Sequence, residues 1–126
     1  MNHPITPEDE RKLRHMLGID DMSKRDPKPY RNYYCAGGKD VAALESLRER
    51  GLVEKRSNGG ALSGGDTVYT ATEEGIRVAK ESQRRGMLSK GKRLYLRFLR
   101  ASDCCPDLTF KTFLTSPDWA ETRKSA

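Results

Sequence analysis

The chain has 126 residues, and its 24 Lys and Arg exceed its 18 Asp and Glu, which gives a net charge of +6. Only 35% of the residues are hydrophobic, and no run of even ten apolar residues occurs, which excludes a transmembrane helix. The polar N-terminus lacks the apolar segment of a signal peptide, so we expect a cytoplasmic protein. This length favours one domain with a small appendage.

The sequence offers few of the residue patterns that enzymes use. Both histidines lie within the first 15 residues, and the motifs of phosphate-binding loops, nucleophile elbows and zinc proteases do not occur. We therefore expect no enzymatic activity and no cofactor. The three cysteines, Cys35 and the adjacent pair Cys104 and Cys105, lack the spacing of zinc sites. They predict reduced thiols and no bound metal.

The first predicted helix covers residues 7–17. Thr6 is suited to accept a hydrogen bond as N-cap, Pro7 fits the first helical position, and three acidic residues meet the positive end of the helix dipole. Gly18 is the expected end of the helix. The apolar stripe at helical spacing comprises Leu13, Met16 and Leu17.

Residues 20–38 predict no helix. Two prolines and six charged residues in 20–29 favour an exposed loop, and the tyrosine-rich residues 30–35 favour extended structure. Stacking of these tyrosines and Arg31 on nucleobases is one interpretation. The interpretation we favour is that the tyrosine rings fill a small core, with the hydroxyls at its rim.

Residues 41–50 predict a second helix, with Asp40 as N-cap and Gly51 just beyond its end. Residues 52–56 and 67–71 then predict two strands that pair as a hairpin, because both runs favour extended structure and the second is rich in β-branched and aromatic residues. The connecting residues 57–66 include four glycines and predict a flexible loop. The buried stripe expected on the second helix comprises Val41, Leu44 and Leu47.

Three helical segments are expected in the remaining chain. Thr72 caps a helix that continues to about residue 85, Ser89 opens a helix that continues to about residue 101, and a short helix follows Pro106. The last five residues are expected to fray. The apolar face expected on the helix after Ser89 comprises Leu94, Tyr95, Phe98 and Leu99.

The order helix, hairpin, helix resembles the second half of a winged helix-turn-helix domain. Two phrases carry this resemblance, L-x-x-L-x-x-x-G-L-V from Leu44 to Val53 and Y-x-x-T-x-x-G from Tyr69 to Gly75. The resemblance implies an α+β, winged-helix-like domain in residues 1–86, with helices and a two-stranded wing, and a C-terminal helical extension in residues 87–126. Residues 20–38 depart from the family because they lack its compact second helix. The whole chain also resembles small proteins of unassigned role in phage or prophage genomes, in residues 13–18 and 30–32.

The resemblance implies a nucleic-acid-binding protein, with duplex DNA as partner and a regulatory role. The alternative is an adaptor that binds an acidic protein surface through the same scaffold. Basic residues are concentrated in residues 80–100, where eight oppose one acidic residue, whereas the helix over residues 41–50 exposes Glu45 and Glu49. We expect no membrane partner, because Tyr95 and Phe98 are needed in the core. The candidate nucleic-acid-binding residues are Lys55 and Arg56 in the wing and Lys90, Arg93, Arg97 and Arg100 in the extension.

Overall fold

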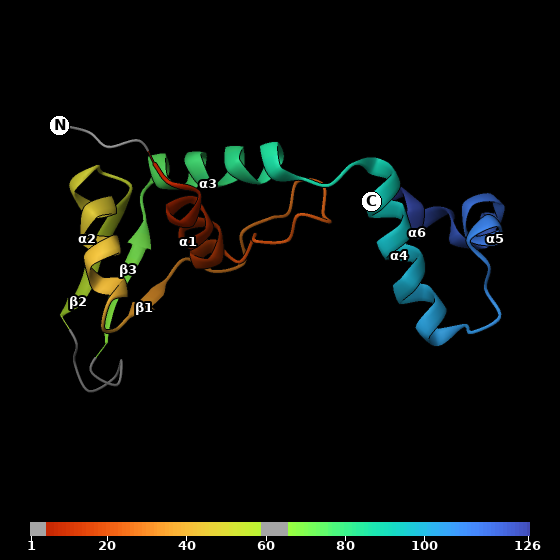
Figure 1. Cartoon of the computed structure of the whole chain (residues 1–126), viewed down its shortest axis with the longest axis horizontal. Helices are drawn as coiled ribbons and strands as arrows, with labels where there is room; N and C mark the ends of the chain where they lie inside the picture. The colour runs from red at the N-terminus through yellow and green to blue at the C-terminus, as the bar shows by residue number, and fades with distance from the viewer. Residues whose placement is uncertain (1–4, 59–65) are drawn as a thin grey trace. The chain divides into compact units, whose positions relative to one another are not determined.

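The computed structural model describes residues 5–58 and 66–126, which form an α+β fold (Figure 1). Two compact units are present: Met1–Asp20 with Lys28–Arg85, and Asp21–Pro27 with Gly86–Ala126. The first unit contains α1 (Pro7–Leu17), β1 (Tyr34–Ala36), α2 (Asp40–Glu49), β2 (Val53–Asn58), β3 (Thr67–Ala71) and α3 (Glu73–Gly86, whose last residue falls in the second unit). The second contains α4 (Lys90–Cys104), α5 (Phe110–Thr115), the 3-10 turn η2 (Pro117–Trp119) and α6 (Ala120–Lys124).

The three strands form one antiparallel sheet in the order β1-β3-β2. The predicted hairpin is confirmed, since β2 pairs with β3 from Val53 opposite Ala71 to Asn58 opposite Thr67. The pairing shifts between Lys55 and Ser57, so Arg56 is the extra residue of a β-bulge. The expected glycine-rich loop lies mostly in residues 59–65, which are outside the described residues.

The segment before α2 supplies the third strand, which sequence analysis expected only as extended structure. Tyr34 pairs with Tyr69 on β3. Just before it, the Asn32 side chain forms two hydrogen bonds with Ala71, accepting from its N–H at 2.7 Å and donating to its carbonyl at 3.1 Å. This amide therefore satisfies backbone groups where the ladder between β1 and β3 has ended. Between Gly18 and Lys39, β1 is the sole regular element.

Helix α1 begins and ends as its sequence predicts. The Thr6 hydroxyl accepts from Asp9 N–H at 3.1 Å, while the Asp9 carboxylate accepts from Thr6 N–H at 3.3 Å, which forms a reciprocal capping box. Gly18 ends the helix in the left-handed region, with φ of 75°. The apolar stripe of α1 is buried, and the helix packs against β3.

The core of the first unit lies between its helices and the sheet. α2 packs against β1 and β2, and the prediction that Leu44 and Leu47 are buried is confirmed. Gly75 at the start of α3 allows the helix to approach the turn before β2, because a Cβ at this position would lie 2.0 Å from the Leu52 carbonyl oxygen. The buried hydrophobic residues are Leu13, Met16, Leu17, Ile19, Ala36, Leu44, Leu47, Leu52, Val53, Tyr69, Ala71 and Ala79.

The second unit is held together by an aromatic cluster. Ser89 caps α4, as predicted, by accepting from Lys92 N–H at 3.3 Å. Phe113 on α5 is fully buried beside Phe98 and Trp119, whose ring centroids each lie 5.9 Å from its own. The expected fraying of the last five residues is wrong, because α6 continues to Lys124 and Ala126 is buried. Arg123 fixes this end by donating to the carbonyls of Phe113 and Ser116.

Candidate nucleic-acid interface

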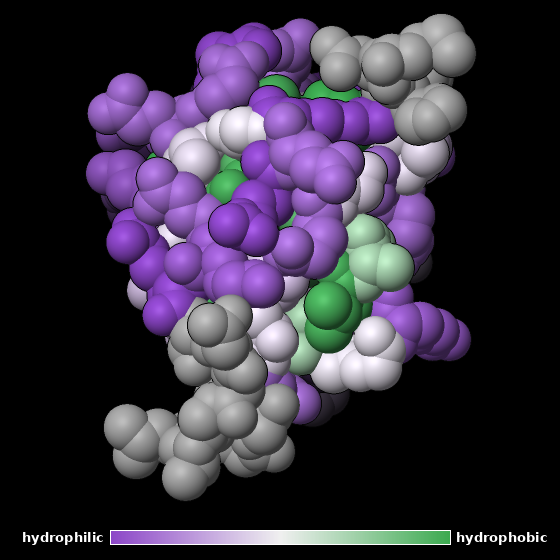
Figure 2. Space-filling view, turned by 90° about the vertical axis from the view of Figure 1, so that its left-hand side faces the viewer, coloured by the Kyte–Doolittle hydropathy of each residue, from purple (hydrophilic) through white to green (hydrophobic). Residues whose placement is uncertain are grey.

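A shallow hollow of about 530 Å³ brings two predicted wing residues together with an arginine from α2. Lys55 and Arg56 come from β2, and Arg48 comes from the last turn of α2. Gly51, which connects the two elements with φ of 76°, also lines the hollow. The face of the molecule that carries α2 and the hairpin is mostly hydrophilic (Figure 2). The hollow is therefore a basic surface formed where a helix leads directly into a hairpin.

The sheet places the two wing cations on opposite faces of β2. Lys55 lies directly opposite Tyr69 in the ladder, so its side chain shares the face that meets α2. Arg56 occupies the bulge and donates from Nε to the Thr70 hydroxyl at 3.0 Å. Because β2 is an edge strand, both side chains border its unpaired edge.

Glu45 on α2 organises the helix-facing side of the hollow. Its carboxylate accepts from the Tyr69 hydroxyl at 2.6 Å and from Arg48 at 3.0 Å, and it lies 3.8 Å from the Lys55 ammonium. The Tyr69 hydrogen bond is the main reason that the pKa of Glu45 is lowered, with further contributions from Arg48 and Lys55. Burial, together with this same hydrogen bond, raises the pKa of Tyr69 to about 12. Glu45 therefore stays ionised and holds both cations at the rim.

On the other side of β2, Glu54 forms an ion pair with Arg56. Its carboxylate lies 2.9 Å from Arg56, and both side chains are more than half exposed. An exposed ion pair of this kind contributes little stability, since water and salt screen it. Arg56 can therefore exchange the carboxylate for another anion at small cost.

The four predicted residues of α4 do not form one accessible stripe. Lys90 and Arg100 are exposed, and Arg100 lies 4.0 Å from Asp21. Arg93 is instead buried, with 7% of its surface exposed, and it donates to the Leu88 carbonyl at 2.6 Å. Arg97 is half-buried and donates to the Ser125 carbonyl. The expectation that Arg93 projects from the surface is therefore wrong, because α4 turns this side toward the interior of the second unit.

The expected apolar face of α4 also needs correction. Tyr95 and Leu99 are 48% and 40% exposed, whereas Leu94 and Phe98 are half-buried. The interior face of α4 therefore combines Phe98 with the stems of two arginines, since long basic side chains can bury their methylenes.

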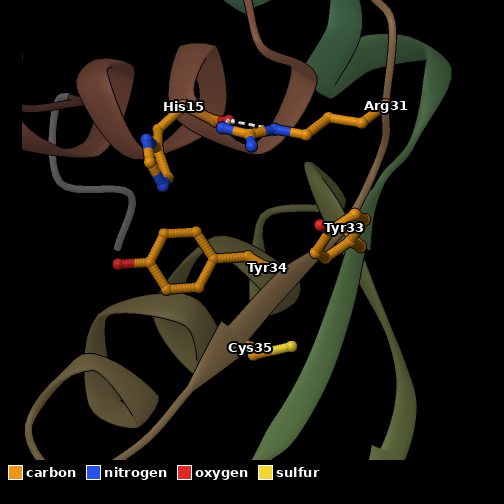
Figure 3. Close-up of a pocket in the computed structure, with 5 residues that line it drawn as sticks. All are labelled: His15, Arg31, Tyr33, Tyr34 and Cys35. Carbon is orange, nitrogen blue, oxygen red and sulfur yellow. Dashed lines mark hydrogen bonds between the residues drawn. The ribbon is translucent and has the colours of Figure 1, made fainter. Parts of the chain in front are cut away.

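A second hollow, of about 330 Å³, lies between α1 and β1 (Figure 3). Arg31 donates from two nitrogens to the His15 carbonyl at 3.1 and 2.7 Å, and this carbonyl in the last turn of α1 also accepts from Gly18 N–H at 3.1 Å. The His15 and Tyr34 rings meet edge to face at 5.7 Å. Tyr33 also lines the hollow and is exposed, as Tyr30 is, so the expectation that these two rings fill a core is wrong. Arg31 therefore joins the segment before β1 to the end of α1.

Arg48 is the site residue that sequence analysis did not propose. The helix predicted over residues 41–50 has Glu45 and Glu49 beside Arg48, and these carboxylates oppose contact with phosphates. The available signal was the position of Arg48 three residues before Gly51, because a tight turn there folds β2 back alongside the last turn of α2.

No protein family model, curated protein sequence or solved structure is significantly similar to this chain. Among residues 5–58 and 66–126, no helix is long and apolar enough to cross a membrane. Within these same ranges, no three His, Cys, Asp or Glu side chains gather as a metal site would require.

Proposed function

We propose that the first unit binds duplex DNA along the hollow bordered by Arg48, Lys55 and Arg56. The observation that carries this proposal is that the end of a helix and the following hairpin contribute three basic side chains to one open surface. Such a surface can meet successive phosphates, whose neutralisation releases counterions and favours binding.

The arrangement of the first unit supports this proposal. Its elements follow the order α1, β1, α2, β2, β3 and α3, with α2 leading directly into the β2–β3 hairpin. This agrees with the winged-helix resemblance of residues 40–85, in which a recognition helix precedes a wing. The segment before α2 contains β1 where that superfamily usually has a further helix. The proposal therefore rests on the helix and hairpin themselves.

The charges favour contacts to phosphates over contacts to bases. The exposed side of α2 presents Ala42, Ser46 and Glu49, which offer few donors to base edges. The hollow also contains Glu54, and Glu45 lies beside it, so three cations face two carboxylates. We expect modest affinity with weak dependence on DNA sequence.

The test compares three double variants of the full chain in fluorescence-anisotropy titrations with a random duplex. Lys55→Gln with Arg56→Gln removes the wing cations, and we expect the slope of log affinity against log salt to become shallower by about two. Lys90→Gln with Arg100→Gln tests the exposed cations of α4 separately. The matched control on α3 removes the same charge through Lys80→Gln and Arg84→Gln.

The control separates local contact from total charge. If the wing and control variants lower the affinity equally, binding follows net charge and the assignment to the hollow is wrong. If only the α4 variant changes the slope, the interface lies on the second unit. An unchanged slope in all three variants contradicts phosphate contact by any of these residues.

A further inference from the structure

The second unit carries an apolar groove, separate from the proposed DNA-binding surface. The groove has a volume of about 430 Å³ and lies between α4 and the first residue of α5. Its lining is almost wholly apolar apart from the side chain of Lys92. The lining residues are Leu88, Gly91, Lys92, Tyr95, Leu96 and Phe110.

The apolar side chains follow one side of α4 at helical spacing. Gly91, Tyr95 and Leu99 recur every four residues and so lie along one stripe of α4, while Leu88 lies just before the N-cap Ser89. From Gly91 to Leu99 this stripe covers roughly 12 Å, or about two helical turns, at the usual rise per residue. Tyr95 and Leu99 are both substantially exposed. A stripe of this length matches the apolar face of a short partner helix.

Gly91 provides an independent indication of close approach. It lies in the first turn of α4, where a Cβ would meet no atom of the chain within 4 Å and where its φ is not positive. Neither the local conformation nor the packing of this chain therefore requires glycine there. Glycine is a poor helix former, so its presence favours a role in admitting another backbone to the groove.

The charges around the groove select the partner. Among the lining residues there is a lysine and no carboxylate, and the first turn of α4 contains Lys90 and Lys92 without an acidic residue. Lys111, which follows Phe110 on α5, is exposed. Lysines at the start of a helix oppose its dipole. Acidic groups of a partner placed there would be attracted both by the lysine side chains and by the positive end of the helix dipole. A second copy of this chain would bring the same positive charges together.

We propose that the groove between α4 and α5 binds an acidic amphipathic helix of a partner protein. Apolar side chains of that helix occupy the space beside Tyr95 and Leu96, and its carboxylates face Lys90 and Lys92. Gly91 allows its backbone to approach α4. This interaction does not depend on DNA binding by the first unit, so the two proposals can fail separately.

The experiment selects binders to the full chain from a displayed library of random peptides about 16 residues long, enough for four helical turns. We expect enriched peptides to combine acidic residues with apolar residues at spacings of three, four and seven. A synthetic copy of the most enriched peptide should gain helical circular dichroism when it binds.

Matched variants of the full chain then locate the binding. Lys92→Glu should weaken the peptide at least about tenfold, whereas Lys124→Glu on α6 makes the same charge change away from the groove and should have little effect. Gly91→Leu should weaken binding similarly without lowering the unfolding temperature, because a Cβ at this position meets no atom of the chain within 4 Å and leucine is a better helix former than glycine. This second variant separates loss of binding from loss of folding.

Three results would overturn the proposal. One is that no peptide is enriched on the wild-type chain relative to the Gly91→Leu variant. Another is that the enriched peptides are basic or bind in extended form. The third is that the wild-type chain sediments as a dimer that Gly91→Leu dissociates, which would assign the groove to a second copy.

Discussion

The two units of the chain differ in how many of their apolar residues they bury. Among the described residues, the first unit buries twelve hydrophobic residues in one cluster, whereas the second buries only Phe113 and Ala126. The large exposed hydrophobic residues are Tyr95, Leu99 and Leu114 in the second unit and Tyr30 and Tyr33 in the first. This difference is the basis of the two binding proposals. The first unit presents charge from a well-packed scaffold, and the second presents apolar surface beside charge.

The largest expected effects come from emptying the two cores. Leu47→Ala in α2 should cost about 2–5 kcal/mol of unfolding free energy, and Phe113→Ala in α5 about 3–5 kcal/mol, because each side chain is fully buried. Chemical denaturation measures both losses. Hydrogen exchange followed by mass spectrometry then locates them, and we expect each variant to loosen mainly its own unit. Equal loosening of both units by either variant would contradict the division.

A smaller contrast comes from two glycines in the first turns of their helices. Gly75→Ala should destabilise the first unit by about 1–3 kcal/mol, because its Cβ would overlap the Leu52 carbonyl oxygen. Gly91→Ala in α4 should be neutral or stabilising by a few tenths of a kcal/mol, because its Cβ meets open space. Thermal unfolding of the two variants provides the measurement. A neutral Gly75→Ala would show that α3 can shift away from β2.

The smallest expected effect is a change in pH dependence within the first unit. Burial and the Glu45 hydrogen bond raise the pKa of Tyr69 to about 12 from an ordinary 10. Because the folded-state pKa is raised, the stabilisation is complete below pH 10 and is lost as the pH rises toward 12. Tyr69→Phe should remove this loss. The ultraviolet absorbance of tyrosinate, followed as the pH rises, measures the ionisation of Tyr69. A wild-type chain in which every tyrosine ionises near pH 10 would contradict the Tyr69–Glu45 contact.

The local elements of the fold were predictable because their signals lie within a few residues. Thr6 and Gly18 specify the ends of α1, and Ser89 specifies the start of α4, through hydrogen bonds and backbone conformations that are local in sequence. The β2–β3 hairpin follows from two strand-forming runs on either side of a glycine-rich stretch. These features do not depend on distant parts of the chain.

Features that depend on distant contacts were not predictable. The pairing of Tyr34 with Tyr69 joins residues far apart in sequence, and residues 34–36 alone do not specify a partner. The burial of Arg93 depends on how α4 packs within the second unit, which the sequence around residue 93 does not specify. Of the candidate site, Lys55 and Arg56 were proposed from their position in the wing, whereas Arg48 joins them through the turn at Gly51.

The most direct test of DNA binding by the first unit is the salt dependence of the affinity of the wild-type chain for DNA. Three phosphate contacts, by Arg48, Lys55 and Arg56, predict a slope of about −2.7 for log affinity against log salt. Binding to a random duplex should then weaken roughly 40-fold between about 50 and 200 mM salt. Absence of binding at the lower salt concentration, or binding that does not change with salt, would contradict the proposal that the first unit recognises DNA through these residues.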